Sequence, residues 1–283
     1  MKGKIVLITG GSDGLGKTTA LSLAKMGAKV VIVGRNETKT KNACEEINAQ
    51  GKPGNCEWML CELSSQNEIR KLASDFISKY PRLDVLINNA GMVAKDFQLT
   101  TEGIEVQFSV NHLSQFLLTN LLIPVLKASA PARIVNIASA GHYSGSIDFE
   151  NLFLEKNYNS LRMYAQTKLC NVLFAYELSR RLSGFGITAN ALHPGMVNTK
   201  IGNKDGGFFN DIAWTLLKPI MVSRETGAET IVFLASSPEA EGKTGMYFQK
   251  CKAKRSKTIS YNEAIAEKLW KVSEDLCGLG GKN

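Results

Sequence analysis

Short apolar runs alternate with longer amphipathic stretches from one end of the chain to the other. The runs are rich in β-branched residues, as at 29–33, which is typical of strands buried on both faces of a parallel sheet. The longer stretches carry apolar residues at helical spacing and stop at glycine or at a capping residue. The pattern predicts strands at 5–8, 29–33, 56–61, 84–87, 132–138, 187–192 and 245–249, and helices at 15–26, 37–50, 66–79, 101–127, 158–183, 224–236 and 262–277.

This alternation predicts an α/β fold of the Rossmann type: a doubly wound parallel sheet of about seven strands with helices on both faces. The chain has 283 residues, and 44% of them are hydrophobic, which is enough to bury one large core. We therefore expect 1–283 to form a single domain. Within it we expect a substrate lid at 196–220 and a C-terminal tail at 250–283.

A glycine-rich turn at 9–16 joins the first strand to the first helix. Glycines allow a tight turn and a close approach to a pyrophosphate, and the helix N-terminus offers free N–H groups to the phosphate. Its spacing departs from the usual GxGxxG pattern, and a glycine turn without a ligand is the alternative. The candidate cofactor ligands in the turn are Gly10, Ser12, Asp13, Gly14, Leu15 and Gly16.

The residue after the second strand distinguishes a cofactor with a 2′-phosphate from one with a free 2′-hydroxyl. An acidic residue here would bind the ribose 2′-hydroxyl and repel a phosphate, whereas an arginine attracts it. The chain has Arg35 followed by Asn36 and no acid, which favours NADP(H) over NAD(H). Asp13 in the glycine turn weakens this prediction, and a surface arginine at a helix start is the alternative.

Polar and small residues follow three later strands, at 88–91, at Ser139 and at 193–195. Open α/β sheets bind ligands in the crevice beyond the carboxyl ends of their strands. Tyr164 and Lys168 share one face of a predicted helix. A nearby ammonium lowers the pKa of a phenol, which makes the tyrosine a general acid or base near neutral pH. The alternative for an isolated Tyr–Lys pair is an exposed helix surface.

Together these motifs resemble the short-chain dehydrogenase/reductase family over almost the whole chain. The matching elements are Thr-Gly-x-x-x-Gly-x-Gly at 9–16, Asn-Asn-Ala-Gly at 88–91, Asn111, Ser139, Tyr-x-x-x-Lys at 164–168 and Pro194-Gly195. The stretches 110–118, 168–174 and 269–276 resemble the retinol dehydrogenase-like branch of the family.

The resemblance implies roles for individual residues. Tyr164 is the expected general acid/base, Ser139 orients the substrate carbonyl, and Lys168 binds the nicotinamide ribose and lowers the pKa of Tyr164. Asn111 is expected to hold a water in a proton relay behind Lys168. The further cofactor contacts that it implies are Glu62, Leu63, Asn89, Gly91, Pro194, Gly195, Val197 and Thr199.

Two positions depart from the family pattern. Glu62 stands where an aspartate usually contacts adenine, and Thr167 precedes Lys168 where serine is usual. Membrane-bound members of the branch carry an N-terminal anchor that this sequence lacks. We see no signal peptide and no apolar run of membrane-spanning length, so we expect a soluble, cytoplasmic protein. The six cysteines show no metal spacing, so we expect reduced thiols and no metal site.

The net charge of +8 suits an anionic cofactor, and no nucleic-acid-binding motif is present. The expected lid is apolar, which favours an apolar carbonyl or alcohol substrate; packing on its own core or a dimer contact is the alternative. The basic stretch 252–257 suggests peripheral contact with an anionic membrane, or else a solvated loop. A homodimer through the helices at 101–127 and 158–183 is a further possibility, and His142 is a candidate substrate contact.

The residues predict a hydride-transfer enzyme that uses NADP(H), mostly as a reductase of an apolar aldehyde or ketone. A retinaldehyde-like substrate follows from the resemblance alone. The alternatives are a reductase of a steroid, quinone or xenobiotic carbonyl, and a non-catalytic regulator that binds NADP(H). Retention of Asn111, Ser139, Tyr164 and Lys168 argues against the regulator, because a sensor needs no acid/base group.

Overall fold

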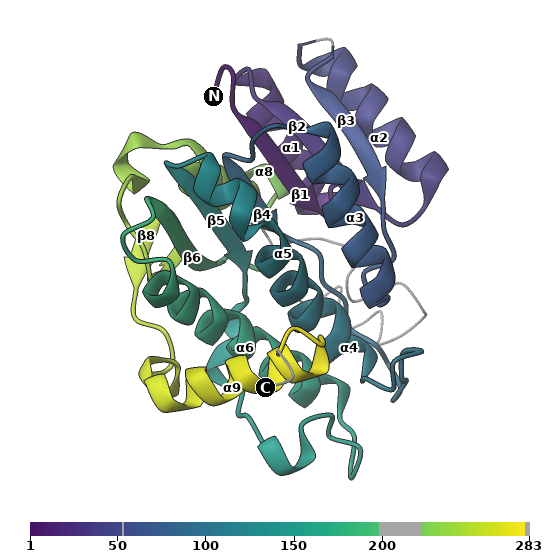
Figure 1. The fold of residues 1–283 in the computed structure, drawn as a ribbon, viewed down its shortest axis with the longest axis vertical. Coiled ribbons are helices and arrows are strands. Elements are labelled where there is room, and N and C mark those ends of the chain that lie inside the picture. The colour runs from purple at the N-terminus through teal and green to yellow at the C-terminus, as the bar shows by residue number, and fades with distance from the viewer. Residues whose placement is uncertain (53, 198–221, 281–283) are drawn as a thin grey trace.

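A twisted eight-stranded sheet forms the centre of the molecule (Figure 1). The structure is a computed structural model that describes residues 1–52, 54–197 and 222–280. The strand order is β3-β2-β1-β4-β5-β6-β7-β8, and all neighbours pair in parallel except β7 and β8. The strands are β1 (Ile5–Thr9), β2 (Lys29–Gly34), β3 (Cys56–Leu60), β4 (Val85–Asn88), β5 (Ala132–Ile137), β6 (Ile187–His193), β7 (Tyr247–Gln249) and β8 (Lys252–Lys254).

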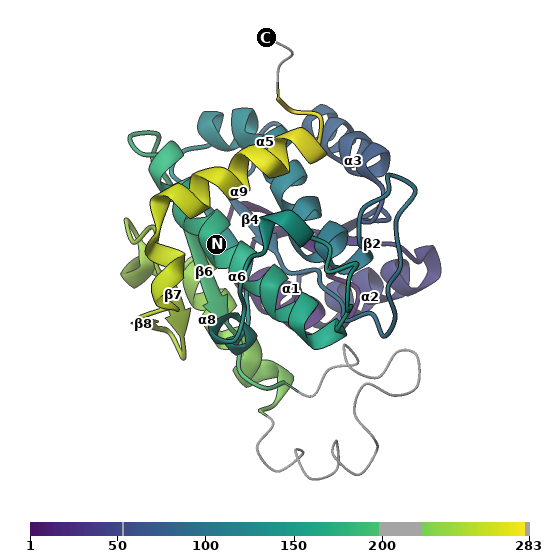
Figure 2. The ribbon, with the colours of Figure 1, turned by 90° about the horizontal axis from the view of Figure 1, so that it is seen from below.

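Helices cover both faces of this sheet, which confirms the predicted doubly wound architecture (Figures 1 and 2). One apolar cluster lies under α1, α2 and α8, and a second under α3, α5, α6 and α9. β1, β2, β4, β5 and β6 bury side chains in both clusters, and β3 buries Cys56 in the first, as expected for parallel strands that are covered on both faces. The helices are α1 (Gly14–Lys25), α2 (Glu37–Gln50), α3 (Gln66–Lys79), α4 (Val106–Phe108), α5 (Ser114–Ala128), α6 (Ser160–Arg181), α8 (Arg224–Ser236) and α9 (Glu263–Leu276).

The prediction of about seven strands missed β8. This strand is the sequence Lys-Ala-Lys, and all three residues are exposed, so no apolar run marks it. It pairs with β7 through a hairpin whose loop residues, Lys250 and Cys251, have φ of 51° and 57°. Such turns usually carry asparagine or glycine, and neither residue is present here to indicate a hairpin.

The long helix predicted at 101–127 begins later and is interrupted. The carboxylate of Glu105 accepts a hydrogen bond from Phe108 N (2.7 Å) and so caps α4. A π-helical turn, Ser109–Leu113, then connects α4 to α5. Wider turns of this kind often mark functional sites in helices, and Asn111 lies inside this one. The apolar spacing extends across the turn, so it gave no indication of the interruption.

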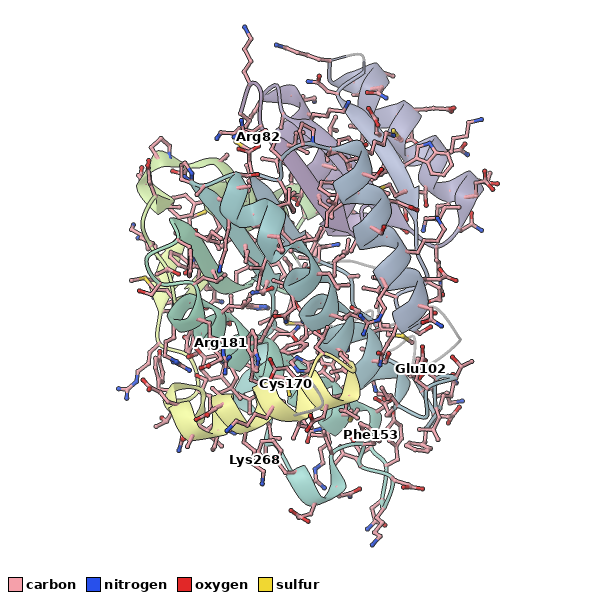
Figure 3. The ribbon with its side chains drawn as sticks, in the orientation of Figure 1. Arg82, Glu102, Phe153, Cys170, Arg181 and Lys268 are labelled. Atoms are coloured by element: carbon pink, nitrogen blue, oxygen red, sulfur yellow. The ribbon has the colours of Figure 1, made fainter. Side chains whose placement is uncertain are left out.

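The C-terminal helix α9 lies across α5 and α6 (Figures 1 and 2). The ring of Trp270 packs 4.8 Å from Phe116 and 5.8 Å from Phe174, measured between ring centroids. The Arg181 guanidinium lies 4.2 Å from the Trp270 ring centroid, and Figure 3 labels Arg181 beside this helix. The predicted homodimer through the two long helices would therefore meet a face that α9 covers.

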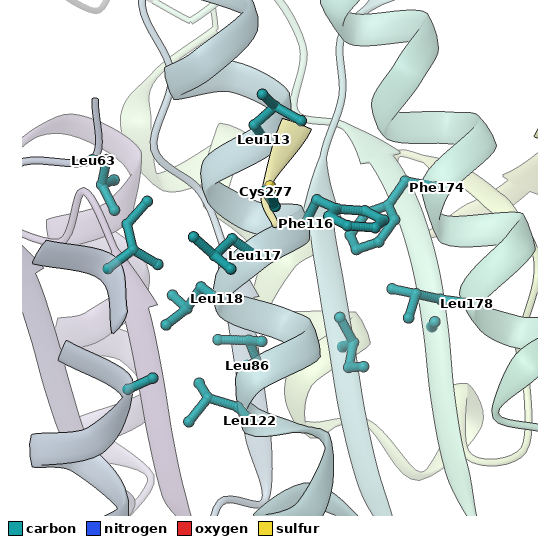
Figure 4. Packing of buried hydrophobic residues seen from close by; sticks show 14 of the residues in the cluster. Leu63, Leu86, Leu113, Phe116, Leu117, Leu118, Leu122, Phe174, Leu178 and Cys277 are labelled. Carbon is teal, nitrogen blue, oxygen red and sulfur yellow. The ribbon is translucent and has the colours of Figure 1, made fainter. Parts of the chain in front are cut away.

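Tight packing under α9 continues into the core. Figure 4 shows Phe116 and Phe174 side by side, with Leu113 and Cys277 close to them. His112 is fully buried here and bonds Ser273 of α9 through its Nε2 atom (2.9 Å). Burial lowers the pKa of His112 to about 3, so this histidine is a neutral core residue.

Among the described helices, none is long and apolar enough to cross a bilayer.

Candidate active site

The predicted site residues gather at the carboxyl edge of the sheet. The glycine turn follows β1, Arg35 follows β2, and Gly91 follows β4. Ser139 follows β5 and Pro194 follows β6, so five neighbouring strands contribute to one edge. The strand order reverses direction between β1 and β4, which is the point where open α/β sheets bind dinucleotides.

The glycine turn is shaped so that side chains cannot replace its glycines. Gly10 and Gly14 have φ of +65° and +51°, a region that favours glycine. A Cβ atom at Gly16 would lie 2.3 Å from the Gly10 carbonyl oxygen and 2.6 Å from Asn89 Nδ2. At its glycines the turn therefore presents only backbone atoms at the N-terminus of α1, and a pyrophosphate fits such a surface.

Asn89 holds this turn in place. Its Nδ2 atom donates to the carbonyl oxygens of Thr9 (2.8 Å) and Gly10 (3.2 Å). In return, the Thr9 hydroxyl accepts hydrogen bonds from the backbone N–H groups of Asn89 and Ala90 (3.0 and 3.1 Å). The Asn89 side chain thus ties the end of β4 to the end of β1, and it positions the cofactor bed from behind.

A group of charges surrounds the start of α1. The Asp13 carboxylate caps α1 by accepting from Gly14 N (2.7 Å), and it pairs with Lys39 Nζ (2.5 Å). Arg224, the first residue of α8, lies 3.8 Å from the same carboxylate. Burial raises the pKa of Asp13, but the hydrogen bonds from Lys39 and Gly14 outweigh this, so the pKa lies below its usual value. Asp13 therefore carries its charge beside two cations.

Arg35 lies on the surface beside this group, with 62% of its side chain exposed. Its Nη1 atom is 3.6 Å from Glu62 Oε2. Asn36 caps α2 by accepting from Lys39 N (2.8 Å), which places Lys39 one turn into the helix. A Cβ atom at Gly34 would lie 3.1 Å from Ser12 Oγ, so the glycine turn and the end of β2 are in close contact.

Glu62 has a local structural contact at the end of β3. Its Oε1 atom accepts from the backbone N (3.1 Å) and hydroxyl (3.0 Å) of Ser64. Leu63 is buried and belongs to the core cluster under α3. The Glu62 carboxylate therefore shapes the turn before α3 and faces Arg35.

Ser139 and Tyr164 both lie against Gly141. Ser139 Oγ accepts a hydrogen bond from Gly141 N (3.2 Å). A Cβ atom at Gly141 would lie 3.5 Å from the Tyr164 ring and 3.6 Å from Ser139 Oγ, so this residue packs against both. Burial raises the pKa of Tyr164 and the Ser139 hydroxyl opposes the rise; the net direction is upward. Lys168 does not contribute the expected lowering, and the phenol is protonated at neutral pH.

Lys168 is a buried cation behind the tyrosine. Only 3% of the residue is exposed, and Nζ donates to the Ile137 carbonyl oxygen (3.2 Å). Nζ lies 5.5 Å from the centroid of the Tyr164 ring. Burial lowers the pKa of Lys168 to about 8, because an ammonium loses hydration in the interior. The amine is mainly protonated at pH 7 and titrates just above it.

Asn111 lies close to Lys168, on the other side of Gly91. Its Oδ1 atom accepts from Met92 N (2.7 Å), and its Nδ2 atom donates to Met92 O (2.9 Å) and to the Thr167 hydroxyl (3.2 Å). A Cβ atom at Gly91 would lie 3.3 Å from both Asn111 Oδ1 and Lys168 Nζ. Thr167, which departs from the family pattern, therefore supplies a hydroxyl that orients the asparagine.

A family model for short chain dehydrogenases matches residues 4–206. The chain belongs to the short-chain dehydrogenase/reductase family. Human retinol dehydrogenase 14 is 40% identical over 99% of this chain and 88% of its own length. Mouse retinol dehydrogenase 12 is 41% identical over 98% of this chain and 87% of its own length. The chain is thus an oxidoreductase of the retinol dehydrogenase-like branch, as its motifs indicated.

Solved structures agree with this short-chain dehydrogenase fold. An uncharacterized protein from Mycobacterium paratuberculosis has a TM-score of 0.79 and 29% identity, with 98% of this chain and 94% of that chain covered. Pseudomonas aeruginosa RhlG, solved as a complex with NADP, has a TM-score of 0.72 and 26% identity, with 88% and 94% covered.

The nicotinamide end predicted for this dehydrogenase is only partly described. Gly195 has φ of +94°, and Val197 forms a bridge with Val222. A Cβ atom at Gly227 of α8 would lie 2.5 Å from Val197 Cγ2 and 2.7 Å from Leu15 Cδ2. Gly227, which the sequence motifs do not mark, therefore allows the segment after β6 to lie against the glycine turn. Thr199 and the lid from 198 onward lie outside the described residues.

His142 does not face a substrate, contrary to the prediction. The residue is fully buried, and its ring packs 4.6 Å from the ring of Tyr247. Nδ1 lies 2.6 Å from the Ser139 carbonyl oxygen, and Nε2 accepts from Lys257 N (3.3 Å). With both nitrogens engaged, His142 fixes the loop after β5 to the C-terminal segment.

Proposed function

We propose that this dehydrogenase transfers a hydride between NADP(H) and a carbonyl/alcohol pair, and that it mainly reduces an apolar aldehyde or ketone. The observation that carries the proposal is the grouping of Ser139 and Tyr164 around Gly141, with the buried Lys168 near the Tyr164 ring and Asn111 beside Lys168 at Gly91. The names of the retinol dehydrogenase relatives support a retinaldehyde-like substrate.

The proton chemistry follows from the two hydroxyls. A carbonyl oxygen placed between Ser139 and Tyr164 would accept a hydrogen bond from each, which orients it and stabilises negative charge on it. The raised pKa of Tyr164 keeps the phenol protonated at neutral pH, so it can give its proton to the forming alkoxide. Hydride exchange at the carbonyl carbon is the chemistry that NADP(H) supplies when bound.

Lys168 and Asn111 support this proton transfer. The ammonium near the Tyr164 ring would attract the negative charge that develops as the phenol loses its proton, and so oppose the rise in the Tyr164 pKa that burial causes. It would also hold the nicotinamide ribose hydroxyls, since Gly91 leaves open the space beside its Nζ atom. Asn111, fixed by Met92 and Thr167, would position a water that returns a proton from solvent.

The proposed preference for NADP(H) rests on cations at the end of β2. Arg35 is exposed there, and Lys39 lies 2.5 Å from Asp13 in the glycine turn. A 2′-phosphate would compete with Asp13 for Lys39 and with Glu62 for Arg35, since a dianion attracts both cations more strongly than a carboxylate does. Ser12 and Asn36 border the same position and would complete it with polar contacts.

The basic residues at 252–257 bear on where this dehydrogenase is located and what its surface contacts. We propose a cytoplasmic enzyme, with peripheral membrane contact through the basic residues of the C-terminal segment. Lys252, Lys254 and Arg255 are exposed, whereas Lys257 Nζ donates to the Gly145 carbonyl oxygen (2.6 Å). Three of these four cations therefore face solvent.

Oxidation of NADPH and of NADH, each followed with a panel of aldehydes and ketones from short-chain to retinoid, tests this function. We expect turnover with NADPH that is confined to long apolar carbonyls. Turnover of a steroid, a quinone or a small xenobiotic carbonyl instead would replace the substrate assignment and keep the chemistry. NADPH binding without turnover of any carbonyl in the panel would favour a regulator that binds the cofactor.

Replacing Arg35 with Asp should raise the KM for NADPH by about 100-fold and leave that for NADH within a few-fold, because it exchanges a phosphate partner for a repelling charge. Steady-state kinetics with both cofactors measure this. Lys39→Ala should shift the same ratio in the same direction by a smaller factor. Lys243→Asp, an exposed charge reversal far from β2, is the control. Equal shifts for the two cofactors in Arg35→Asp would contradict the 2′-phosphate site.

A further inference from the structure

A cavity of about 540 Å³ opens between α2 and β3, away from the proposed active site. These two elements lie side by side at one end of the molecule (Figure 1). Cys56 is the first residue of β3, whereas the glycine turn and Ser139 follow the carboxyl ends of β1 and β5. The residues that matter in its wall are Cys44, Asn48, Cys56, Trp58, Glu57 and Lys79.

Asn48 fixes the two cysteines opposite one another. Its Oδ1 atom accepts from Cys56 N (2.8 Å), and its Nδ2 atom donates to Cys56 O (3.0 Å). The same Nδ2 lies 3.8 Å from Cys44 Sγ, one helical turn earlier in α2. One amide therefore clamps the start of β3 to the turn of α2 that carries Cys44, and both cysteines line the same cavity.

The paired thiols differ from the other buried cysteines. The interaction with Cys56 lowers the pKa of Cys44, and the same interaction together with burial raises that of Cys56. Burial instead raises the pKa of Cys61 and of Cys277 to about 12, and it raises that of Cys170 as well. Because the thiolate is the nucleophile, Cys44 is the reactive sulfur of this set.

We propose that Cys44 and Cys56 form a redox-active dithiol that exchanges with a low-molecular-weight disulfide entering the cavity between α2 and β3. The Cys44 thiolate attacks one sulfur of the small disulfide, which breaks its S–S bond and releases one thiolate. The Cys56 thiol then loses its proton and attacks Cys44, which releases the second thiolate. The protein dithiol loses two electrons and two protons, and the small disulfide becomes two thiols.

The bridge would join α2 covalently to β3 and close a ring over residues 45–55, of which 45–50 are the last part of α2. Since a cross-link restricts the unfolded chain, the oxidised protein should unfold at a higher temperature than the reduced protein. The Asn48 side chain already holds the start of β3 beside the turn of α2 that carries Cys44, so the bridge would join two segments that are in contact. The inference stands on the cavity and the thiol pair, and it is independent of the proposed reaction.

Peptide mapping of the full-length protein after exposure to oxidised glutathione tests the proposal. The reduced, desalted protein is incubated with this probe, alkylated and digested without reductant. We expect a peptide that links Cys44 to Cys56, a loss of two thiol equivalents, and reversal of both by dithiothreitol. Cys251→Ser, which removes a partly exposed thiol elsewhere, should form the same bridge.

Single replacements separate the two sulfurs. Cys56→Ser should accumulate a glutathione adduct on Cys44, because no resolving thiol is left, and Cys44→Ser should accumulate several-fold less adduct on Cys56. Circular dichroism checks that each variant is folded, and Cys44→Ala and Cys56→Ala serve if either serine variant is not. The proposal is overturned if glutathione modifies Cys251 while Cys44 and Cys56 both remain alkylated as free thiols. It is also overturned if either cysteine bridges to a different partner.

Discussion

Tyr164→Phe should lower kcat by about a thousandfold or more for every carbonyl that the enzyme reduces. The phenol lies beside Ser139 at Gly141 and near Lys168, so its loss removes the proposed proton donor. General acid catalysis typically contributes about 10²- to 10⁴-fold. The ring itself remains, so packing against Gly141 is kept and the Kd for NADPH should change less than threefold.

Tyr176→Phe is the matched control for this variant. Tyr176 lies on the same helix, α6, and its hydroxyl is buried against the hydroxyl of Ser256 (2.7 Å). Its replacement also removes one buried phenol oxygen, at a cost of about 1 kcal/mol in stability, but should leave kcat unchanged. Rates measured by stopped-flow absorbance under saturating NADPH give the comparison. Wild-type turnover in Tyr164→Phe would remove the tyrosine from the mechanism.

Lys168→Met should lower kcat by about a hundredfold while making the protein more stable at pH 7. The ammonium is buried with 3% exposure, and its pKa falls from 10.5 to about 8, so the folded state binds the proton less well than the unfolded state. At about 1.4 kcal/mol for each pKa unit, removing the charge should raise the free energy of unfolding by up to about 3 kcal/mol. The Ile137 carbonyl oxygen keeps its bond from Asn171 Nδ2 (3.2 Å).

The pH dependence distinguishes this buried charge from an ordinary loss of packing. Between pH 8 and 10.5, the unfolded chain retains the Lys168 proton that the folded chain has lost, so wild-type stability gains from rising pH there. The advantage of Lys168→Met should be fully present below pH 8 and gone by about pH 10.5. Urea unfolding at several pH values measures it, with Lys271→Met, an exposed lysine on α9, as the control. If Lys168→Met were less stable than wild type at pH 7, the buried ammonium could not be destabilising the folded state.

The sequence predicted the sheet and the main site because both depend on local signals. Buried parallel strands appear as apolar runs, and Ser139, Asn111, Tyr164 and Lys168 lie at strand ends or on helices where the motifs indicated them. Roles for these residues beyond their geometry remain predictions.

The sequence did not predict features that depend on contacts between distant parts of the chain. Lys39 meets Asp13 only because α2 starts beside the glycine turn, and Gly227 meets Val197 only after the sheet has formed. The pKa of Tyr164 was expected to fall because Lys168 is near in sequence, whereas burial decides its direction. β8 has no apolar residue pair to reveal it, since its side chains face solvent.

Transfer of deuterium from NADPH that carries deuterium at both C4 positions of the nicotinamide tests the central claim most directly. The purified enzyme is incubated with the labelled cofactor and retinaldehyde, or with a long-chain aliphatic aldehyde, and the alcohol is analysed by mass spectrometry. We predict an alcohol that carries one deuterium, formed by the wild-type enzyme and by Tyr176→Phe but not by Tyr164→Phe. Unlabelled alcohol, or equal labelled product from Tyr164→Phe, would contradict the account.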